Sequence, residues 1–191
     1  MKKYTLAEYI ETTIAVLEDL RSEEKKIHLL AEHIAHCLRS GNKVIFCGNG
    51  GSAADAQHLS AELMGRFLKD RKPMAALSLT VDTSALTAIG NDYGYDEVFA
   101  RQLEGIGNVG DVVICMSTSG NSKNVVRCAS FATQNGMFVA GMTGQSVGAL
   151  GEFCNLTFKV KSSETNVIQE AHQILGHFLC KLVEDIVCPA K

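Results

Sequence analysis

Apolar residues recur every three or four positions at the start of the chain, which is the period of an amphipathic helix. Two such stripes follow one another, and Gly41 comes after the second as a stop signal. The stripes consist of Leu6, Ile10, Ile14, Leu17 and Leu20, then Ile27, Leu30, Ala31, Ile34 and Leu38. We therefore predict a helical leader over residues 1–40, whose apolar side packs on its own core or on a partner subunit in an oligomer.

After Gly41 the pattern changes to short β-rich runs that alternate with helical stretches. The predicted strands are Lys43–Cys47, Ala75–Leu79, Val112–Met116, Met137–Met142 and Asn155–Val160. The predicted helices cover about 53–66, 83–104 (broken around Gly90–Gly94), 122–135, 147–152 and 166–187. A run that is apolar at every position, such as Val112–Met116, indicates a strand covered on both faces. The pattern predicts an α/β fold: a three-layer α/β/α sandwich with a five-stranded parallel sheet, in one domain over residues 1–191.

Composition narrows the possible partners of this domain. The 191 residues suffice for one sizeable core, and a net charge of −3 argues against a nucleic-acid binder. No apolar run approaches the ~18 residues that span a bilayer, and the first residues do not read as a signal peptide. The 7 cysteines form no C-x-x-C pair and lie mostly in apolar stretches. We expect buried thiols in a reducing cytoplasm, with neither disulfides nor a cysteine zinc site.

A serine-rich loop, Ser117–Ser122, follows the third predicted strand and opens a helix. Its hydroxyl side chains are Ser117, Thr118, Ser119 and Ser122. Free N–H groups and the positive end of the helix dipole favour an anion at such a position, and ligands of parallel sheets bind beyond the carboxyl ends of strands. The loop predicts an oxyanion or phosphate site, although one hydroxyl could serve only as a helix cap.

A glycine-rich loop, Gly48–Ala53, follows the first strand in the same way. Its sequence fits the dinucleotide pattern G-x-G-x-x-G/A, which makes a nicotinamide or flavin enzyme a competing interpretation. The acidic residue expected after the second strand would be Asp82, which lies later than the usual ~20 residues. A plain tight turn is an equal alternative, and the absence of a G-K-[ST] sequence excludes a Walker P-loop.

Two predicted helices carry candidate acid–base and metal-binding side chains. His58 and Glu62 are four residues apart and share a helix face, as an ordinary surface pair also would. On one broad side, the last helix offers Gln169, then His172 or Gln173, then Gly176 or His177. If the two helices meet, two imidazoles and one carboxylate could bind zinc, with glutamine a less usual fourth ligand. A core position for His177 is the simpler alternative, because its neighbours are apolar.

A turn-rich segment, Gly90–Asp96, interrupts the helical pattern of residues 83–104. Its polar side chains, including Asn91 and Asp92, could contact substrate hydroxyls at the edge of the sheet. A simple helix break explains the same residues equally well.

Four segments together resemble the phosphoheptose isomerases of the sugar isomerase (SIS) superfamily. They are CGNGGSAADAQHLSAEL (47–63), SALTAIGNDYGYDEVFARQ (84–102), GDVVICMSTSGNS (110–122) and IQEAHQILGH (168–177). The resemblance implies a flavodoxin-like SIS domain and a homotetramer with active sites between subunits. It also implies isomerisation of sedoheptulose 7-phosphate to D-glycero-D-manno-heptose 7-phosphate through an enediol, the first step toward the heptose of bacterial surface polysaccharide.

The resemblance also assigns roles to residues. Glu62 corresponds to the catalytic base and His177 to its partner acid, and zinc would be bound by His58, Glu62, Gln169 and His177. The phosphate and sugar contacts it implies are Asn49, Gly50, Gly51, Ser52, Glu62, Asn91, Asp92, Ser117, Thr118, Ser119, Ser122 and Gln169. One position departs from the pattern, because Val167 stands where such isomerases commonly carry arginine. Non-catalytic SIS proteins that bind the replication initiator or sense a sugar phosphate are the alternatives, but the initiator-binding relatives have replaced the positions of Glu62 and His177.

Overall fold

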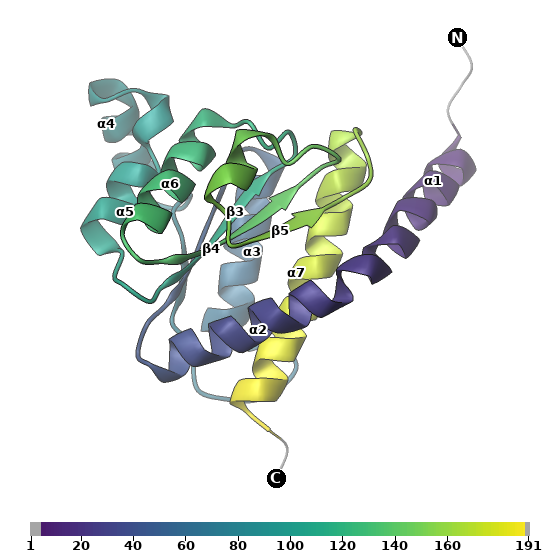
Figure 1. Ribbon diagram of the computed structural model, residues 1–191, viewed down its shortest axis with the longest axis horizontal. Helices are drawn as coiled ribbons and strands as arrows, with labels where there is room; N and C mark the ends of the chain where they lie inside the picture. The colour runs from purple at the N-terminus through teal and green to yellow at the C-terminus, as the bar shows by residue number, and fades with distance from the viewer. Residues whose placement is uncertain (1–4, 190–191) are drawn as a thin grey trace.

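A five-stranded parallel sheet forms the middle layer of the fold (Figure 1). The computed structural model describes residues 5–189. The strands run in the spatial order β2-β1-β3-β4-β5. Their bounds are β1 Val44–Gly48, β2 Ala76–Ser78, β3 Val112–Ser117, β4 Phe138–Thr143 and β5 Leu156–Lys159. The order reverses next to β1 and β3, so the loops after these two strands lie at the switch point where such sheets bind ligands.

Each face of the sheet has its own apolar core, because successive strand residues point to opposite sides. Val44 and Phe46 of β1 join the core beneath α2 (Glu24–Arg39), α3 (Gly51–Met64) and α7 (Thr165–Val187). Ile45 and Cys47 point the other way, into the core beneath α5 (Ala100–Ile106) and α6 (Lys123–Gln134). Burial on both faces explains why β1 and β3 are buried at every position. The predicted three-layer sandwich is confirmed.

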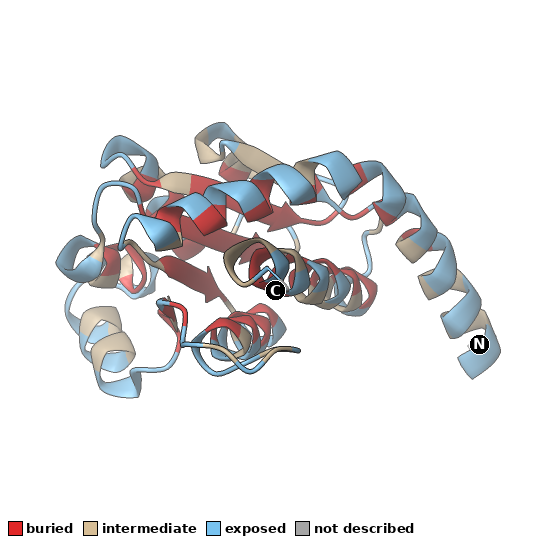
Figure 2. Cartoon of the chain, turned by 90° about the horizontal axis from the view of Figure 1, so that it is seen from below, coloured by how far each residue is buried: buried red, intermediate tan, exposed pale blue. Residues whose placement is uncertain are grey.

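The helical leader divides into two parts with different surroundings. Helix α2 packs along α7 and buries Ile27, Leu30 and Ile34 in its own subunit. Helix α1 (Leu6–Asp19), joined to α2 by the 3₁₀ turn η1 (Leu20–Glu23), extends away from the sandwich and is mostly exposed (Figures 1 and 2). The second predicted stripe therefore belongs to the core, while much of the first remains uncovered within one chain.

The broken helix predicted at 83–104 consists of three pieces in the structure. Helix α4 (Thr83–Asp92) ends at Tyr93, the 3₁₀ turn η2 (Tyr95–Glu97) follows, and α5 begins at Ala100. Gly94 lies between them at φ 90°, a conformation that glycine adopts without steric cost. The predicted helix at 147–152 is the 3₁₀ turn η3 (Gly148–Phe153). Within the described part of the chain, no helix combines the length and apolar character needed to cross a bilayer.

Candidate active site

Helices α3 and α7 lie against each other and run in the same direction, which brings their polar residues together in successive rungs. The carboxamide of Gln169 lies against Gly51, and Gln173 Nε2 donates to Asp55 Oδ1 at 2.6 Å. His177 meets His58 in the next rung. These residues repeat at spacings of three or four on both helices, so one face of each helix supplies the whole set.

Gly176 allows this close approach of the two helices. A Cβ atom on Gly176 would lie 2.4 Å from Cδ1 of Leu59, well inside van der Waals contact. A side chain there would push α7 away from α3, and the neighbouring His177 would move with it. The close approach of α3 and α7 that brings His177 to His58 therefore requires glycine at position 176.

The third rung holds a cluster of His58, Glu62 and His177, called the His–Glu–His cluster below. The Nε2 atoms of the two histidines are 2.8 Å apart, and His58 Nε2 lies 3.4 Å from Glu62 Oε1. One ligand atom from each residue lies within 4.8 Å of the other two. Two imidazole nitrogens and a carboxylate oxygen are donors that zinc prefers, so the donor set fits this metal.

A polar cavity of about 330 Å³ lies at the carboxyl ends of β1 and β3, beside the first turns of α3 and α7. The glycine loop and the serine loop line it together. Its walls include Asn49, Gly50, Gly51, Ser52, Ser117, Thr118, Ser122 and Gln169. No charged side chain is among the described lining residues, so hydroxyls, amides and helix N-termini would hold an anion here. We call this space the oxyanion cavity.

The serine loop keeps its shape through its own hydrogen bonds and one glycine. Ser117 Oγ lies 3.0 Å from Ser122 Oγ, and Gly120 adopts φ 69°. A Cβ atom on Gly120 would lie 2.2 Å from the backbone oxygen of Val147. Because both the backbone conformation and the contact with Val147 exclude a side chain, the loop requires glycine at position 120.

Two polar residues beside the cavity, Asn124 and Tyr95, were not among the predicted site residues. Asn49 and Asn124 exchange two hydrogen bonds of 2.8 Å, and Tyr95 donates its hydroxyl to Asn49 Oδ1 at 3.1 Å. The predicted substrate contacts Asn91 and Asp92 lie at the exposed end of α4 and bond to each other at 2.8 Å. Tyr95, which follows Asn91 and Asp92 in the chain, contacts the glycine loop through Asn49.

Several other residues that the sequence singled out have different surroundings. His172 is fully buried and donates from Nε2 to the Thr143 carbonyl, so Gln173 rather than His172 faces α3. Burial lowers the pKa of His172 to about 4, although the bond to Thr143 opposes this shift. Asp82 caps α4 by accepting from the Ala85 N–H, a structural role. Val167 is buried in the apolar core beneath α2, α3 and α7.

The fourth predicted zinc ligand, Gln169, lies apart from the other three. Its carboxamide contacts Gly51 and lines the oxyanion cavity, about two helical turns before His177. The structure thus brings His58, Glu62 and His177 together and places Gln169 with the phosphate-binding candidates. Its role as a ligand stays a prediction.

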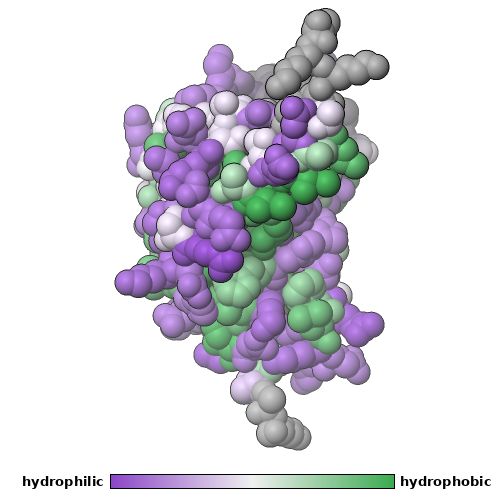
Figure 3. All heavy atoms as spheres, turned by 90° about the vertical axis from the view of Figure 1, so that its right-hand side faces the viewer, coloured by the Kyte–Doolittle hydropathy of each residue, from purple (hydrophilic) through white to green (hydrophobic). Residues whose placement is uncertain are grey.

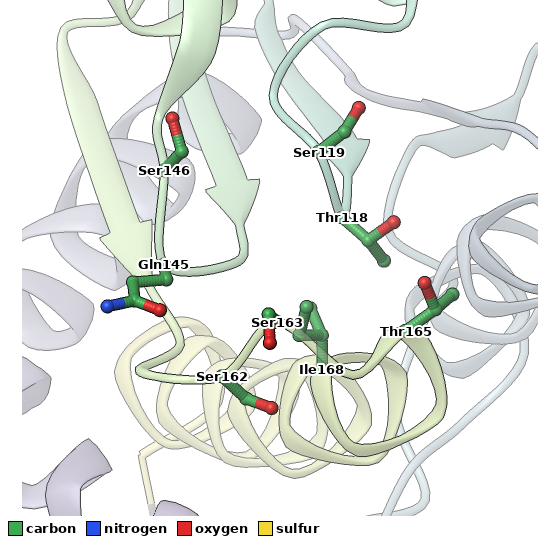
Figure 4. Close-up of a pocket in the computed structure, with 8 residues that line it drawn as sticks. All are labelled: Thr118, Ser119, Gln145, Ser146, Ser162, Ser163, Thr165 and Ile168. Carbon is green, nitrogen blue, oxygen red and sulfur yellow. The ribbon is translucent and has the colours of Figure 1, made fainter.

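A second hollow, of about 370 Å³, adjoins the oxyanion cavity and shares Thr118 and Thr165 with it. Figure 4 shows its hydroxyl side chains on three sides: Ser119 and Thr118 from the serine loop, Ser146 after β4, and Ser162, Ser163 and Thr165 before and at the start of α7. Thr165 was not a predicted site residue. The first turn of α7 therefore contributes to both spaces.

A family model of the SIS domain matches residues 8–144. The chain belongs to the SIS-domain family.

Within that family, the chain is similar to proteins named phosphoheptose isomerase. The chain is 48% identical over 183 residues to the phosphoheptose isomerase of Akkermansia muciniphila, covering 94% of this chain and 97% of the relative. It is 54% identical over 151 residues to the enzyme of that name from Rhodospirillum rubrum, covering 79% and 80%. The match to the Akkermansia muciniphila enzyme covers nearly the full length of both chains, which places this chain in the phosphoheptose isomerase family.

Solved structures agree with this placement. The phosphoheptose isomerase of Neisseria gonorrhoeae matches with a TM-score of 0.88 and 38% identity, covering 94% of this chain and 97% of the other. The one from Francisella tularensis matches at 0.90 and 34%, covering 94% and 96%. A more distant SIS-domain neighbour, the Vibrio vulnificus NanR protein complexed with ManNAc-6P, shares the fold alone at 14% identity and a TM-score of 0.66.

Proposed function

We propose that this chain isomerises sedoheptulose 7-phosphate to D-glycero-D-manno-heptose 7-phosphate by proton transfer in the His–Glu–His cluster. The observation that carries the proposal is the arrangement along α3 and α7: an oxyanion cavity at one end, and an acid–base pair further along the same helix face. Ser52 and His58 are separated by about 9 Å along α3 at a rise of ~1.5 Å per residue. This separation suits an extended sugar whose phosphate and carbonyl lie at opposite ends.

The proposed reaction moves two protons between neighbouring carbon and oxygen atoms. The Glu62 carboxylate removes a proton from C1 of the ketose, while the His177 imidazolium donates a proton to the carbonyl oxygen on C2. The product of this step is the enediol. His177 then takes the proton from the hydroxyl on C1, and Glu62 returns its proton to C2, which leaves the aldehyde at C1. Both residues end in their starting protonation states.

Zinc is the proposed cofactor, and His58, Glu62 and His177 would hold it, with Gln169 as the expected fourth ligand. A zinc-bound carboxylate is a poor base and an imidazolium cannot bind zinc, so the metal would have to leave Glu62 and His177 free during proton transfer. A bound zinc ion would polarise substrate oxygens and stabilise negative charge on them. The oxyanion cavity would meanwhile hold the phosphate through Ser52, Ser117, Thr118 and Ser122. Ser119, which lines the adjoining hollow, stays a proposed phosphate contact. Asn49, Gly50, Gly51, Asn91 and Asp92 stay proposed sugar contacts.

We also propose that the protein is a homotetramer in the cytoplasm, with active sites at subunit interfaces. Large apolar side chains are exposed on α1, where Leu6 is 74% and Ile14 is 53% accessible. On α7, Ile174 and Phe178 are exposed on either side of His177. Figure 3 shows apolar residues gathered in a band on the face that α1 and α7 present. A partner subunit that covers these side chains would also enclose the His–Glu–His cluster.

The test of the proposed function is turnover of sedoheptulose 7-phosphate by purified, zinc-loaded protein, followed by NMR of the sugar. We expect formation of the aldose, and at least tenfold weaker use of unphosphorylated sedoheptulose. No conversion of the phosphorylated sugar would contradict the proposal. Light scattering of the same sample tests the tetramer, which a monomeric mass would contradict.

The non-catalytic alternatives receive no support from the site. Both proposed proton-transfer residues are present, with a ligand atom of each within 4.8 Å of the other, and the serine loop has all four hydroxyls. A sensor or adaptor would need only the oxyanion cavity.

A further inference from the structure

A buried ion pair joins α7 to the segment after α3, on the side of the His–Glu–His cluster away from the oxyanion cavity. Arg71 Nε lies 2.9 Å from Glu184 Oε1, and the two side chains are only 2% and 1% exposed. Glu184 follows His177 by seven residues on α7, so both residues lie on the same helix face. The pair is outside the site described above.

Glu184 organises the chain that leaves α3. Its carboxylate accepts hydrogen bonds from the backbone N–H groups of Phe67, Leu68 and Lys69, at 3.3, 2.9 and 2.9 Å. Burial favours a higher pKa for the Glu184 carboxyl, but these N–H groups and the Arg71 guanidinium together lower it. The carboxylate is thus held in its charged form, with both oxygens occupied.

Arg71 completes the end of α3 itself. Its Nη2 donates to the Glu62 carbonyl at 2.8 Å, and Nη1 donates to the Leu63 carbonyl at 2.9 Å. Carbonyls in the last turn of a helix lack partners within the helix, so the guanidinium supplies them. The turn that carries the Glu62 side chain is therefore fixed to α7 through Arg71 and Glu184.

The same segment touches the imidazole of His177. The Phe67 ring lies nearly parallel to that of His177, at an angle of 17° and a centroid distance of 5.8 Å. Glu184 binds the backbone N–H of Phe67, so the ion pair also determines where this ring lies.

We infer that the Arg71–Glu184 pair and Phe67 are positioning residues, which hold the Glu62 carboxylate and the His177 imidazole in their mutual geometry. The inference rests on the proposed function, because it concerns the two residues that would transfer protons. The oxyanion cavity is formed by other segments, at the opposite end of α3. Loosening the ion pair should therefore slow the chemical step while leaving substrate binding largely intact.

The chain offers a matched control in a second buried carboxylate with the same kind of structural role. Asp111 is fully buried, pairs with Lys43 Nζ at 2.7 Å, and accepts from the backbone N–H groups of Lys43 and Asn108. It lies at the start of β3, at the far end of the sheet from the catalytic candidates. Asp111→Asn and Glu184→Gln remove equivalent charges, but only the second is next to the site.

The test compares Glu184→Gln, Phe67→Leu and Asp111→Asn in steady-state kinetics with sedoheptulose 7-phosphate, well below the melting temperature of each protein. We expect kcat to fall about tenfold or more in Glu184→Gln and severalfold in Phe67→Leu, with KM within about twofold of wild type. Asp111→Asn should lower the melting temperature but leave kcat within about twofold. If Glu184→Gln does not fold, the half-buried Phe67 provides the deciding variant.

The inference would be overturned if folded Glu184→Gln and Phe67→Leu had the kcat of wild type, or if Asp111→Asn lost as much kcat as Glu184→Gln. If the wild-type protein itself does not isomerise the sugar, the proposed function fails, and a second measurement decides the positioning role. Zinc affinity, measured by competition with a chromophoric chelator, should then weaken about tenfold or more in Glu184→Gln and remain unchanged in Asp111→Asn. Equal affinities in both variants and wild type would overturn it.

Discussion

The helix pairs α3–α7 and α5–α6 cover opposite faces of the same sheet, but they differ in what lies between them. Between α3 and α7 are amide, carboxylate and imidazole groups in successive rungs, brought close by Gly176. The core beneath α5 and α6 contains apolar side chains and three fully buried thiols, Cys47, Cys115 and Cys128. The second pair contributes to the site through the serine loop before α6 and through Asn124 in the first turn of α6. The candidate catalytic groups therefore lie on one face of the sheet, and the opposite face is mainly apolar core.

The largest contrast is expected from His177→Gln and Arg127→Gln, one variant on each side of the sheet. Glutamine can still donate a hydrogen bond but cannot transfer a proton at C2, so we expect kcat to fall by about 10²–10⁴. Arg127 pairs with Glu97 on the exposed side of α6, and its variant should stay within about twofold. Steady-state turnover of both proteins measures the difference, and equal activities would erase the distinction between the faces.

The pH dependence of stability should reveal the buried imidazole of α7. The folded-state pKa of His172 is about 4, below the ordinary value of 6.5, so the folded protein binds fewer protons than the unfolded chain between these values. Stability is then lost as pH falls from 6.5 to 4, by up to about 3 kcal/mol. Urea titrations of wild type and His172→Gln should show a flatter profile for the variant, which keeps a hydrogen-bond donor. Parallel profiles would contradict this account.

Two glycines with the same backbone conformation compare the serine loop with a plain helix end. Gly120 and Gly41 both have positive φ, but only Gly120 has backbone atoms where a Cβ would lie. We expect Gly120→Ala to raise KM about tenfold and to destabilise the fold by about 1–3 kcal/mol. Gly41→Ala should cost only about 1 kcal/mol with KM unchanged. Kinetics and chemical unfolding of the two variants test this, and indistinguishable KM values would count against a binding role for the loop.

The smallest effect is expected at the thiols. All seven cysteines are free, and five of them are buried. Burial raises the pKa of Cys37 to about 11 and of Cys180 to about 12, which keeps both as unreactive thiols. Burial also raises the pKa of Cys154 to about 11, so we expect iodoacetamide at pH 8 to modify mainly Cys188 in the native protein, with little change in kcat. Mass spectrometry of digests measures the modified positions, and rapid modification of the buried cysteines would contradict this prediction.

The sequence predicted the strands and both strand-end loops well, because continuous apolar runs and clustered small residues are local signals. It placed His58, Glu62 and His177 on helices but could not show that α3 and α7 meet, since that depends on Gly176 against Leu59. The contact of Tyr95 with Asn49 and the bonds of Glu184 to residues 67–71 were missed for the same reason. They join residues far apart in the chain, and no spacing pattern encodes them. The choice between His172 and Gln173 likewise depended on the rotation of α7.

The most direct test of the account compares wild type with Glu62→Gln during incubation of sedoheptulose 7-phosphate in D₂O. NMR follows the C1 protons and the aldose product, and binding of the sugar phosphate to each protein is measured by calorimetry. The account predicts that wild type forms the aldose, whereas Glu62→Gln binds the sugar phosphate but forms aldose at least about 10²-fold more slowly. Equal rates of conversion by the two proteins would contradict the central claim that α3 carries the catalytic base.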